Sequence, residues 1–386
     1  MVHPADSRHA IRTDGTNAFA RYSMEVRVPK IARDTLARNP EAPASVRQAV
    51  LDLAAAIERD EPIPAPRPPI LDTDAWERAY DAHAGERWLS AEWFYAELTF
   101  YREMLAAFRY WETGLDPFEP FKDEEIAADR LWQRLARVQG LARGSREERV
   151  HLLLDGALWA NRVDLSYTVA AMREHAHEAD FLVDDRAKAV PLLAQGDPDL
   201  HLVADNAGTE LCLDLALVDA VLEAPRSRAT LHLKIEPTFV SDAMPKDVWR
   251  LCDAMAARGG EPQALAARLR TAFGEGRLRL RPDPFWSGPG FLEQAPPRVV
   301  RSLERATIVV FKGDANYRRV VRDRLWAADA PFSDACGMFP FPLLCLRTMK
   351  SDALLGLPPG LAPRLDAEEP RWRIDGQRGV AQLHLG

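Results

Sequence analysis

Three side chains that offer oxygen ligands follow two apolar runs of this 386-residue chain. Asp205 and Asn206 come directly after the apolar run 200–204, and Asp242 follows the apolar run 229–235 a few residues later. Carboxylate and amide oxygens, without thiolate or imidazole, suit hard divalent cations whose remaining positions are filled by water or substrate. The three residues are therefore candidate metal ligands.

Positive charge follows two further apolar runs, “ATIVVF” and “PLLCL”. The two clusters carry, in chain order, Lys312, Asp314, Asn316, Tyr317, Arg318, Arg347, Lys350 and Asp352. Carboxylates that hold a metal beside several cations are what a phosphoryl group needs, because metal and cations neutralise the charge on its oxygens. The residue types therefore predict phosphoryl chemistry.

Each cluster also has a simpler structural interpretation. Asp205-Asn206 before an apolar helical pattern is typical of a helix N-cap, whose side-chain oxygen accepts the free N–H groups of the first turn. Asp242 can be a cap as well, “KGDANYRR” a turn before a solvated helix, and Lys350 a surface lysine. Four clusters in equivalent positions favour a common site over four unrelated roles.

The clusters need a scaffold that brings the ends of strands together. Short apolar runs with strand character are separated by helical patterns in the second half of the chain, at 200–204, 229–235, 306–311, 342–348 and 379–385. Such alternation predicts a layered α/β domain with a mostly parallel sheet. Ligands bind beyond the carboxyl ends of the strands in such sheets, so we expect the four clusters to converge on one crevice.

The first part of the chain has a different pattern of apolar residues. Segments such as “ASVRQAVLDLAAAIERD” and “SAEWFYAELTFYREMLAAFRYWETG” have apolar residues at helical spacing. We therefore predict an N-terminal helical domain over 1–150 and an α/β metal-binding catalytic domain over 151–386. The long connection 243–305 carries “PDPFWSGPG”, which its proline and glycine content predicts to be a surface loop.

The charge and composition of the chain restrict the classes of partner that it can have. The formal net charge of −8 gives no electrostatic reason to expect nucleic acid as a partner. The four cysteines are scattered without CxxC spacing, which argues against a zinc ribbon or a thioredoxin-like motif. The start “MVHPADSRHA” lacks the apolar region of a signal peptide, and no apolar run reaches membrane-spanning length. We expect a cytoplasmic protein that binds neither membrane nor nucleic acid.

Several segments together resemble one family in order and spacing. “DNAGTELCLD”, “HLKIEPTFVSDAMPKD”, “FKGDANYRR” and “LRTMKSD” resemble the damage-control phosphatase family, also called the acidic-residue methyltransferase-like family. In the N-terminal half, “WFYAELTFYR”, “DPFEPFK” and “LWANRVDLS” are similar to further segments of that family. The resemblance runs from “FARYSMEVRVPKI” to about residue 355, and is closest to the subgroup with an N-terminal helical domain that acts on sugar phosphates.

This resemblance implies a fold, a reaction and a set of site residues. The fold is a three-layer α/β/α sandwich after a helical N-terminal domain. The reaction is hydrolysis of fructose 1-phosphate, fructose 6-phosphate or a related small phosphorylated metabolite, with Mn²⁺, Co²⁺, Ni²⁺ or Mg²⁺ as the cofactor. The metal ligands are Asp205, Asn206 and Asp242, the substrate contacts include Asp314, Asn316, Tyr317 and Arg318, and Lys350 contacts phosphate.

The resemblance leaves the mechanism and two other functions open. A cation on its three ligands would polarise a phosphoryl oxygen, with Lys350 and Arg318 holding the others. Either Asp205 attacks phosphorus directly, or Asp314 orients an attacking water. Some relatives are described as S-adenosylmethionine-dependent carboxyl methyltransferases, although this chain has no glycine-rich nucleotide loop. A non-catalytic sugar-phosphate sensor is the third alternative.

The chain departs from the family pattern at three positions near the predicted pocket. Leu98 and Thr99 replace a Cys-Tyr pair in the helical segment. Glu236 stands where histidine or an aromatic residue is common. All three bear on the choice of substrate rather than on the metal ligands.

Overall fold

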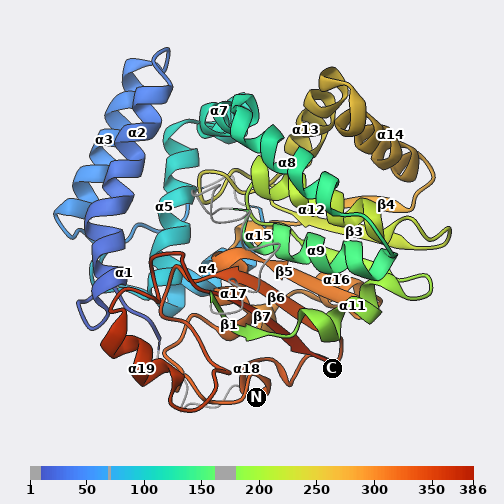
Figure 1. The fold of residues 1–386 in the computed structure, drawn as a ribbon. Helices are drawn as coiled ribbons and strands as arrows, with labels where there is room; N and C mark the ends of the chain where they lie inside the picture. Colours follow the sequence, from blue (N-terminus) through green and yellow to red (C-terminus); the bar gives the residue numbers. More distant parts are fainter. Residues whose placement is uncertain (1–9, 68–70, 161–179) are drawn as a thin grey trace.

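A seven-stranded sheet organises the computed structural model, which describes residues 10–67, 71–160 and 180–386 (Figure 1). The strands are β1 (Phe181–Asp184), β2 (Asp199–Val203), β3 (Arg228–Leu233), β4 (Leu278–Pro282), β5 (Ile308–Lys312), β6 (Leu343–Thr348) and β7 (Gly379–His384). Their order across the sheet is β1-β7-β6-β5-β2-β3-β4, and every neighbouring pair is parallel except β6 and β7. The predicted α/β fold with a mostly parallel sheet is confirmed.

Helices precede the sheet and connect its strands. Those before β1 are α1 (Ala18–Tyr22), η2 (Ser23–Arg27), α2 (Val28–Arg38), α3 (Ala44–Glu58), α4 (Thr73–Ala82), α5 (Trp93–Ala107), α6 (Tyr110–Thr113), α7 (Glu119–Ala127), α8 (Asp129–Leu141) and α9 (Arg146–Leu158). Those after β1 are α11 (Arg186–Ala194), α12 (Thr209–Val221), α13 (Pro245–Arg258), α14 (Gly260–Gly274), α15 (Pro284–Ser287), η4 (Leu292–Gln294), α16 (Pro297–Leu303), α17 (Gly313–Val321), α18 (Ser333–Cys336) and α19 (Leu361–Glu368).

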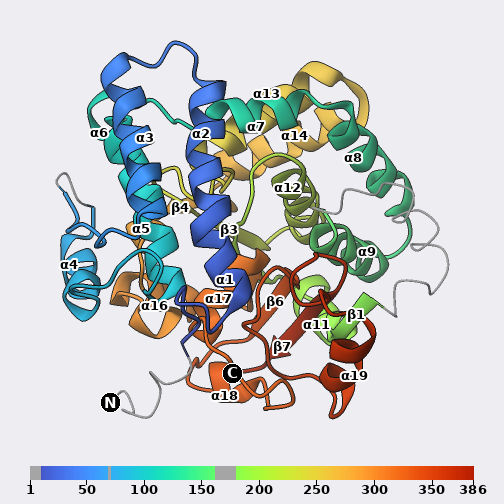
Figure 2. The same ribbon diagram turned by 90° about the vertical axis from the view of Figure 1, so that its left-hand side faces the viewer.

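Helices cover both faces of the sheet, which makes three layers (Figure 2). Leu200, Leu202 and Val310 point to one face and pack in a core with residues of α8, α9 and α11 to α14. Val309 and Phe311 point to the other face, toward α5, α16 and α17. The inner strands are apolar on both sides because both sides are buried, as expected for a parallel sheet.

The N-terminal helices divide between these two layers. Helices α2, α3 and α5 belong to the core on the α17 side, whereas α8 and α9 belong to the core around α12. The predicted domain boundary at residue 150 falls inside α9, which runs over Arg146–Leu158. Whether residues before and after it fold as separate units stays a prediction.

Strand order reverses between β2 and β5, and this places the predicted site. The chain leaves β2 through α12 to β3 on one side, and leaves β5 through α17 to β6 on the other. Val203 of β2 is in register with Phe311 of β5 and with His232 of β3. The segments that follow these strands therefore emerge side by side at the point where ligands bind in open α/β sheets.

The prediction of a surface loop in the connection 243–305 is wrong. The connection contains α13 to α16 and the edge strand β4. Phe285 and Trp286 of “PDPFWSGPG” are buried in the core, and Arg319 of α17 donates to the carbonyl oxygens of Trp286 and Gly288. Proline at the first turn of α15 starts that helix rather than breaking structure.

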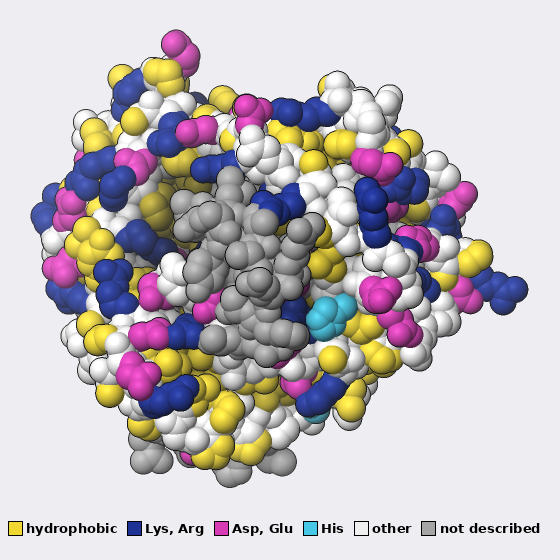
Figure 3. Space-filling model, viewed as in Figure 1, with side chains coloured by type: hydrophobic (Ala, Val, Ile, Leu, Met, Phe, Trp, Pro, Cys, Tyr) yellow, Lys and Arg dark blue, Asp and Glu magenta, His cyan; other side chains and the backbone are white. Residues whose placement is uncertain are grey.

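The surface and the cysteines agree with the composition. Basic and acidic side chains are interspersed over the face that Figure 3 shows. All four cysteines are free and buried. Within the described ranges, no helix combines the length and apolarity needed to cross a membrane. Most of the segment “LWANRVDLS” and the start of the chain lie outside the described residues.

Candidate active site

The loop after β2 carries Asp205 and Asn206 but does not use them as a helix cap. Helix α12 begins at Thr209 with Gly208 as its N-cap residue, and the Thr209 N–H donates to Glu125 Oε1 at 2.9 Å. The Asn206 amide instead donates to Asp205 Oδ2 at 2.8 Å and to Glu210 Oε2 at 2.6 Å. The capping interpretation of this pair is wrong. The Asn206 side chain is instead held in place within the loop, because its Oδ1 also accepts a hydrogen bond from Ser241 Oγ, and one lone pair of this oxygen remains for a ligand.

The loop after β3 lies against the loop after β2. Backbone hydrogen bonds join Ala207 N–H to Ser241 O at 2.6 Å and Ala243 N–H to Asp205 O at 2.8 Å. Residues 206 and 242 consequently form an isolated antiparallel bridge. These contacts bring Asp242 beside Asp205 and Asn206, as the sequence predicts for a common site.

The loop that carries Asp242 is strained. Phe239 and Val240 have φ angles of 50° and 68°, in the left-handed region that a β-branched residue rarely adopts. Such conformations cost roughly 1–3 kcal/mol each and persist only where surrounding structure enforces them. Helix α13 begins at Pro245 with Met244 as its N-cap residue, so Asp242 is not a cap either. The strained backbone at Phe239 and Val240 thus lies just before Asp242, whose carboxylate lines the crevice.

Asp242 is buried next to a lysine that satisfies it only in part. Lys234 Nζ lies 3.2 Å from Asp242 Oδ2 but donates its hydrogen bond to Trp286 O at 2.6 Å. No described residue makes a hydrogen bond to Asp242 Oδ2. Burial raises the pKa of Asp242 to about 6, against the opposing effect of Lys234. Asp242 Oδ2 is thus a buried carboxylate oxygen whose nearby cation, Lys234, is shared with the Trp286 carbonyl oxygen, which makes Asp242 a candidate metal ligand.

Gly313 allows α17 to approach Asp205 closely. Its φ of +82° favours glycine, and a Cβ atom there would lie 1.9 Å from Asp205 Oδ2. The glycine sits between Lys312, the last residue of β5, and Asp314, the second residue of α17. Only glycine therefore lets the carboxylates of Asp205 and Asp314 line one crevice.

Asp314 is held in its ionised form by two donors. Arg347 Nε and Ser351 Oγ donate to Asp314 Oδ1 at 2.8 Å and 3.0 Å. Burial alone would raise the pKa of Asp314, but Arg347, Arg318 and the Ser351 hydrogen bond outweigh it, and the pKa lies below its usual value. Arg347 thus orients a carboxylate and does not itself line the crevice.

The other predicted cationic side chains differ in how many hydrogen bonds and ion pairs they make with described residues. Lys312 is buried behind the lining, where it pairs with Asp214 at 2.9 Å and with the lining residue Glu210 at 3.4 Å. Arg318 lines the crevice, but its guanidinium donates to Glu97 at 2.7 Å and to Asp323 at 2.7 and 2.9 Å. Lys350 is exposed and makes no hydrogen bond or ion pair with a described residue. Lys350 is the cation best placed to take an anionic ligand.

The prediction that Asn316 and Tyr317 contact substrate is not supported by the geometry, since neither lines the crevice. The Asn316 amide donates to the carbonyl oxygens of Ala204 and Lys312 at 3.0 and 2.8 Å, which ties the end of β2 to the end of β5. The Tyr317 hydroxyl donates to Gln382 at 2.9 Å. Both side chains hold the scaffold of the site.

The crevice between these elements encloses about 210 Å³. It is lined by Arg27, Trp93, Glu97, Tyr101, Leu158, Asp205, Asn206, Glu210, Phe239, Asp242, Gly313, Asp314, Ala315, Arg318, Leu346, Thr348 and Lys350. Three charged lining residues were not predicted, Arg27, Glu97 and Glu210, although all three lie in family-like segments: “MEVR”, “WFYAELTFYR” and “DNAGTELCLD”. Arg27 donates to Glu97 at 2.6 Å, which joins η2 and α5 to the site.

The three residues that depart from the family pattern do not line the crevice. Leu98 packs with Trp76 and Phe94, and the Thr99 hydroxyl donates to a backbone carbonyl of its own helix. Glu236 accepts a hydrogen bond from Trp111 Nε1 at 2.6 Å. These residues shape the surroundings of the site rather than its surface.

The donor set of Asp205, Asn206 and Asp242 fits a hard divalent cation. Burial, followed by the Glu210 and Asp242 carboxylates, raises the pKa of Asp205 well above its usual value despite Lys350 and Lys312. A cation would relieve this crowding of negative charge. Across the described residues, no three His, Cys, Asp or Glu side chains form a metal-binding group, so the Asn206 amide oxygen would have to complete the protein ligands.

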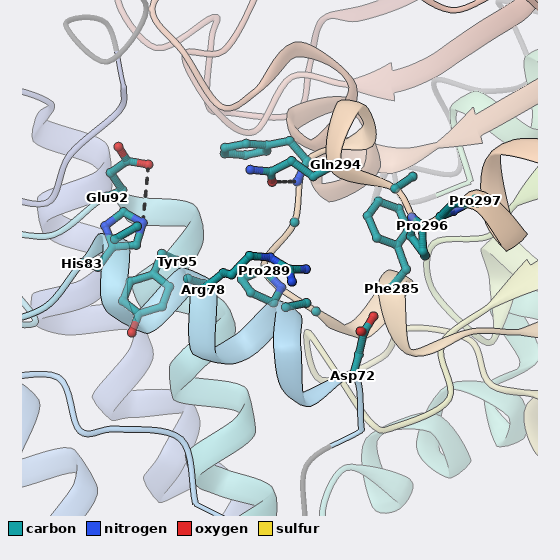
Figure 4. A pocket seen from close by; sticks show the side chains of 17 residues that line it. Asp72, Arg78, His83, Glu92, Tyr95, Phe285, Pro289, Gln294, Pro296 and Pro297 are labelled. Carbon is teal, nitrogen blue, oxygen red and sulfur yellow. Dashed lines mark hydrogen bonds and ion pairs between the residues drawn. The ribbon is translucent and has the colours of Figure 1, made fainter. Parts of the chain in front are cut away.

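A larger cavity of about 680 Å³ lies elsewhere, between α4 and the loop 285–297 (Figure 4). It contains none of the predicted site residues. Tyr95 stacks on the His83 ring there at 4.3 Å, and proline and glycine backbone forms much of the opposite wall. We place the chemistry in the smaller crevice, because only there do carboxylates, an amide and a free cation converge at strand ends.

Comparisons with known proteins point to one family. The family model described as the damage-control phosphatase ARMT1-like domain matches residues 23–365. Damage-control phosphatase ARMT1 of Xenopus laevis is 29% identical over 356 residues, covering 81% of each chain. The Rattus norvegicus protein of that name is 27% identical over 440 residues, covering 98% of this chain and 99% of its own. A solved DUF89 family protein of Pyrococcus horikoshii aligns over 95% of both chains at 13% identity, with a TM-score of 0.49.

The matched region includes the N-terminal helices and the segments after the strands that together line the crevice. It begins in η2, which carries Arg27, and ends in α19, beyond Lys350. The segments after β2, β3, β5 and β6 all lie inside it. The chain belongs to the damage-control phosphatase ARMT1-like family.

Proposed function

We propose that the protein is a divalent-metal-dependent phosphatase that hydrolyses phosphate monoesters of small sugars, of the fructose 1-phosphate or fructose 6-phosphate type. Membership of the family supports a metabolite damage-control phosphatase. The single observation that carries the finer proposal is the crevice, where Asp205, Asn206 and Asp242 face Asp314 and Lys350.

Asp205, Asn206 and Asp242 would hold Mn²⁺, Co²⁺, Ni²⁺ or Mg²⁺. A cation bound there supplies Lewis-acid stabilisation of charge on phosphoryl oxygens. The protein's own contribution is a buried set of oxygens fixed by backbone hydrogen bonds between two loops. Preorganised groups of this kind need little reorganisation during the reaction, which is where much of catalysis arises.

Lys350 would bind the phosphoryl group through charge-assisted hydrogen bonds. Lys350 has no partner among the residues that the structure describes, whereas the guanidinium of Arg318 is shared between Glu97 and Asp323. Arg318 therefore contributes a fixed positive potential at the wall of the crevice. The volume of about 210 Å³ and the aromatic rings of Trp93, Tyr101 and Phe239 suit a small sugar phosphate rather than a polymer.

Two carboxylates remain candidates for the first step. Asp205 would attack phosphorus and break its bond to the sugar oxygen, which leaves as the alcohol after taking a proton; water would then hydrolyse the acyl phosphate. Alternatively, Asp314 would orient a water that attacks phosphorus directly. Asp314 has its Oδ1 engaged by Arg347 and Ser351, and its pKa is lowered. Borohydride trapping during turnover separates the routes, because it reduces an acyl phosphate on Asp205 to an alcohol whichever atom the water attacks.

The test of the function is phosphate release from a panel of phosphorylated sugars, with each metal and with EDTA. Asp205→Ala is expected to lower kcat/KM by roughly 10³-fold or more, since it removes several kcal/mol of charge stabilisation. Asp219→Ala is the matched control, because Asp219 lies on the adjacent helix α12 in a pair with exposed Arg268. Full activity in Asp205→Ala, or full activity in EDTA, would contradict the proposal. Binding of sugar phosphates without turnover would instead indicate a sensor.

A further inference from the structure

Five arginines line a second polar cavity, which lies between β2, β3, β4 and the α16 segment. The cavity encloses about 260 Å³ and shares no lining residue with the crevice. Arg279 and Arg281 come from β4, whereas Arg298 and Arg301 come from α16, and Arg305 follows that helix. Five guanidiniums in one place are unexpected in a chain whose net charge is −8.

Three of these arginines have side chains without a partner among the described residues. Arg281, Arg301 and Arg305 are exposed, and none of their guanidiniums makes a hydrogen bond or ion pair in the described part of the chain. By contrast, Arg298 is paired with Asp283 at 2.7 and 2.8 Å. Arg279 donates to the Gly276 carbonyl oxygen at 3.2 Å. Like charges held close without partners repel one another, so an anionic ligand would stabilise the cluster.

Buried polar side chains form the inner wall of the cavity. Thr230 and Ser302 are 3% and 6% exposed, and each has a hydroxyl that can donate to an oxyanion. His201 is also buried, with its Nδ1 3.0 Å from His232 Nε2. Asp199 is the one carboxylate among the described lining residues. Burial raises the pKa of Asp199, against the opposing effect of the positive charges of Arg228 and Arg279. The cavity therefore offers donors around a strongly positive rim.

We propose that this cavity binds a small anion that carries two phosphoryl groups. Guanidiniums bind phosphate oxygens in pairs of parallel hydrogen bonds, and here they approach from two elements, β4 and the α16 segment. Each side would take one phosphoryl group, with Thr230 and Ser302 at the inner end. None of the described residues that line the cavity is Phe, Tyr or Trp, on which bases could stack, and this favours a compact anion over single-stranded nucleic acid.

Calorimetry with methylenediphosphonate tests the proposal, because this diphosphate analogue is not hydrolysed. The full chain is titrated in EDTA, so that no metal contributes to binding in the crevice. Arg281→Ala with Arg301→Ala is expected to weaken binding at least tenfold. Arg364→Ala with Arg371→Ala removes the same charge from exposed arginines outside both cavities and is expected to leave the affinity unchanged. Lys350→Ala is expected to bind as the wild type does.

Several outcomes would overturn the site. Equal affinity in the Arg281/Arg301 variant, or equal losses in both double variants, would show that no specific cavity is used. Loss of affinity in Lys350→Ala alone would place the ligand in the crevice instead. A single-stranded oligonucleotide that binds more tightly than methylenediphosphonate, and is lost in the Arg281/Arg301 variant, would indicate nucleic acid. Absence of binding at millimolar methylenediphosphonate would also overturn the proposal.

Discussion

At the scale of single residues, the geometry of the site depends on the missing side chain of Gly313 as well as on the side chains that line the crevice. Gly313 has no Cβ, and Asp205 occupies the space where one would lie. The resemblance predicts Asn316 and Tyr317 as substrate contacts from one short segment, but Asn316 joins the ends of β2 and β5, and Tyr317 donates to Gln382 within β7. A helix turns successive side chains to different faces, so Asp314 meets the crevice while these neighbours are buried behind it.

Gly313→Ala is expected to lose most activity and to destabilise the fold by more than the cost of its φ angle alone. The added Cβ would displace the Asp205 carboxylate, which is 1.9 Å away. Gly85→Ala is a matched control, because Gly85 has a φ of +83° with no atom within 4 Å of its Cβ position. The strain common to both is roughly 1–3 kcal/mol. Equal loss of stability and unchanged activity in both variants would contradict the role of Gly313.

Lys350→Ala is expected to lower kcat/KM roughly 10²- to 10³-fold, as removal of a charge-stabilising donor does at other sites. Its stability should change by less than about 0.5 kcal/mol, because the side chain is exposed and unpaired among the described residues. Lys188→Ala on α11 is the control, since this exposed lysine pairs only with Asp185. Steady-state kinetics and urea unfolding measure both quantities. A loss equal to that of Lys188→Ala would remove Lys350 from the site.

At the scale of elements, buried ion pairs connect the N-terminal helices to the sheet domain. Lys122 of α7 lies 2.8 Å from Asp247 of α13 and 3.3 Å from Asp116, and all three are buried. The family-like segment “DPFEPFK” contains two of them, so its residues serve the scaffold and not the crevice.

Lys122→Met is expected to destabilise the protein by about 3–5 kcal/mol, because it leaves the buried carboxylate of Asp247 without its cation, whereas Asp116 keeps Lys246 at 3.1 Å. Arg268→Met, which breaks the exposed 2.8 Å pair with Asp219, should cost only about 0–1 kcal/mol. Urea unfolding compares the two variants directly. Adding Asp247→Asn to Lys122→Met should recover part of the loss. Equal costs for the exposed and buried pairs would contradict this account.

The sequence predicts the inner strands and misses the edge strands. The apolar runs of β2, β3, β5, β6 and β7 were visible because both faces of these strands are buried. Strand β4 reads “LRLRP”, with arginines on the face that carries the second cavity, and so lacks a continuous apolar run. Strand β1 has four residues and borders only β7. Convergence of the clusters followed from topology, whereas Arg27 and Glu97 could be assigned only once the packing of distant helices was known.

At the scale of the whole molecule, one crevice collects residues from both ends of the chain. Arg27 and Glu97 come from the N-terminal helices, and Asp205, Asp314 and Lys350 come from segments after three different strands. Occupancy of the crevice should therefore stabilise the assembly of these elements, and not only one loop.

Mn²⁺ is expected to raise the Tm of the EDTA-treated protein, with about 2.7 kcal/mol of stabilisation at a concentration of 100 times Kd. Asp242→Asn should abolish this shift, because it removes a buried anionic ligand while keeping the shape of the side chain. Asp253→Asn is the control, since Asp253 is exposed and pairs with Arg270. Differential scanning calorimetry measures the shift without any substrate. An unchanged shift in Asp242→Asn would place the cation elsewhere.

The strand order has a consequence for synthesis on the ribosome. Strand β1 borders only β7, which follows it by nearly two hundred residues, and β7 lies inside the sheet between β1 and β6. A nascent chain that has emerged only as far as β6 has no neighbour for β1 and exposes one edge of β6. Unpaired edges of this kind invite association between chains. Slow translation of residues 349–378 should therefore prolong the period in which the growing chain depends on chaperones.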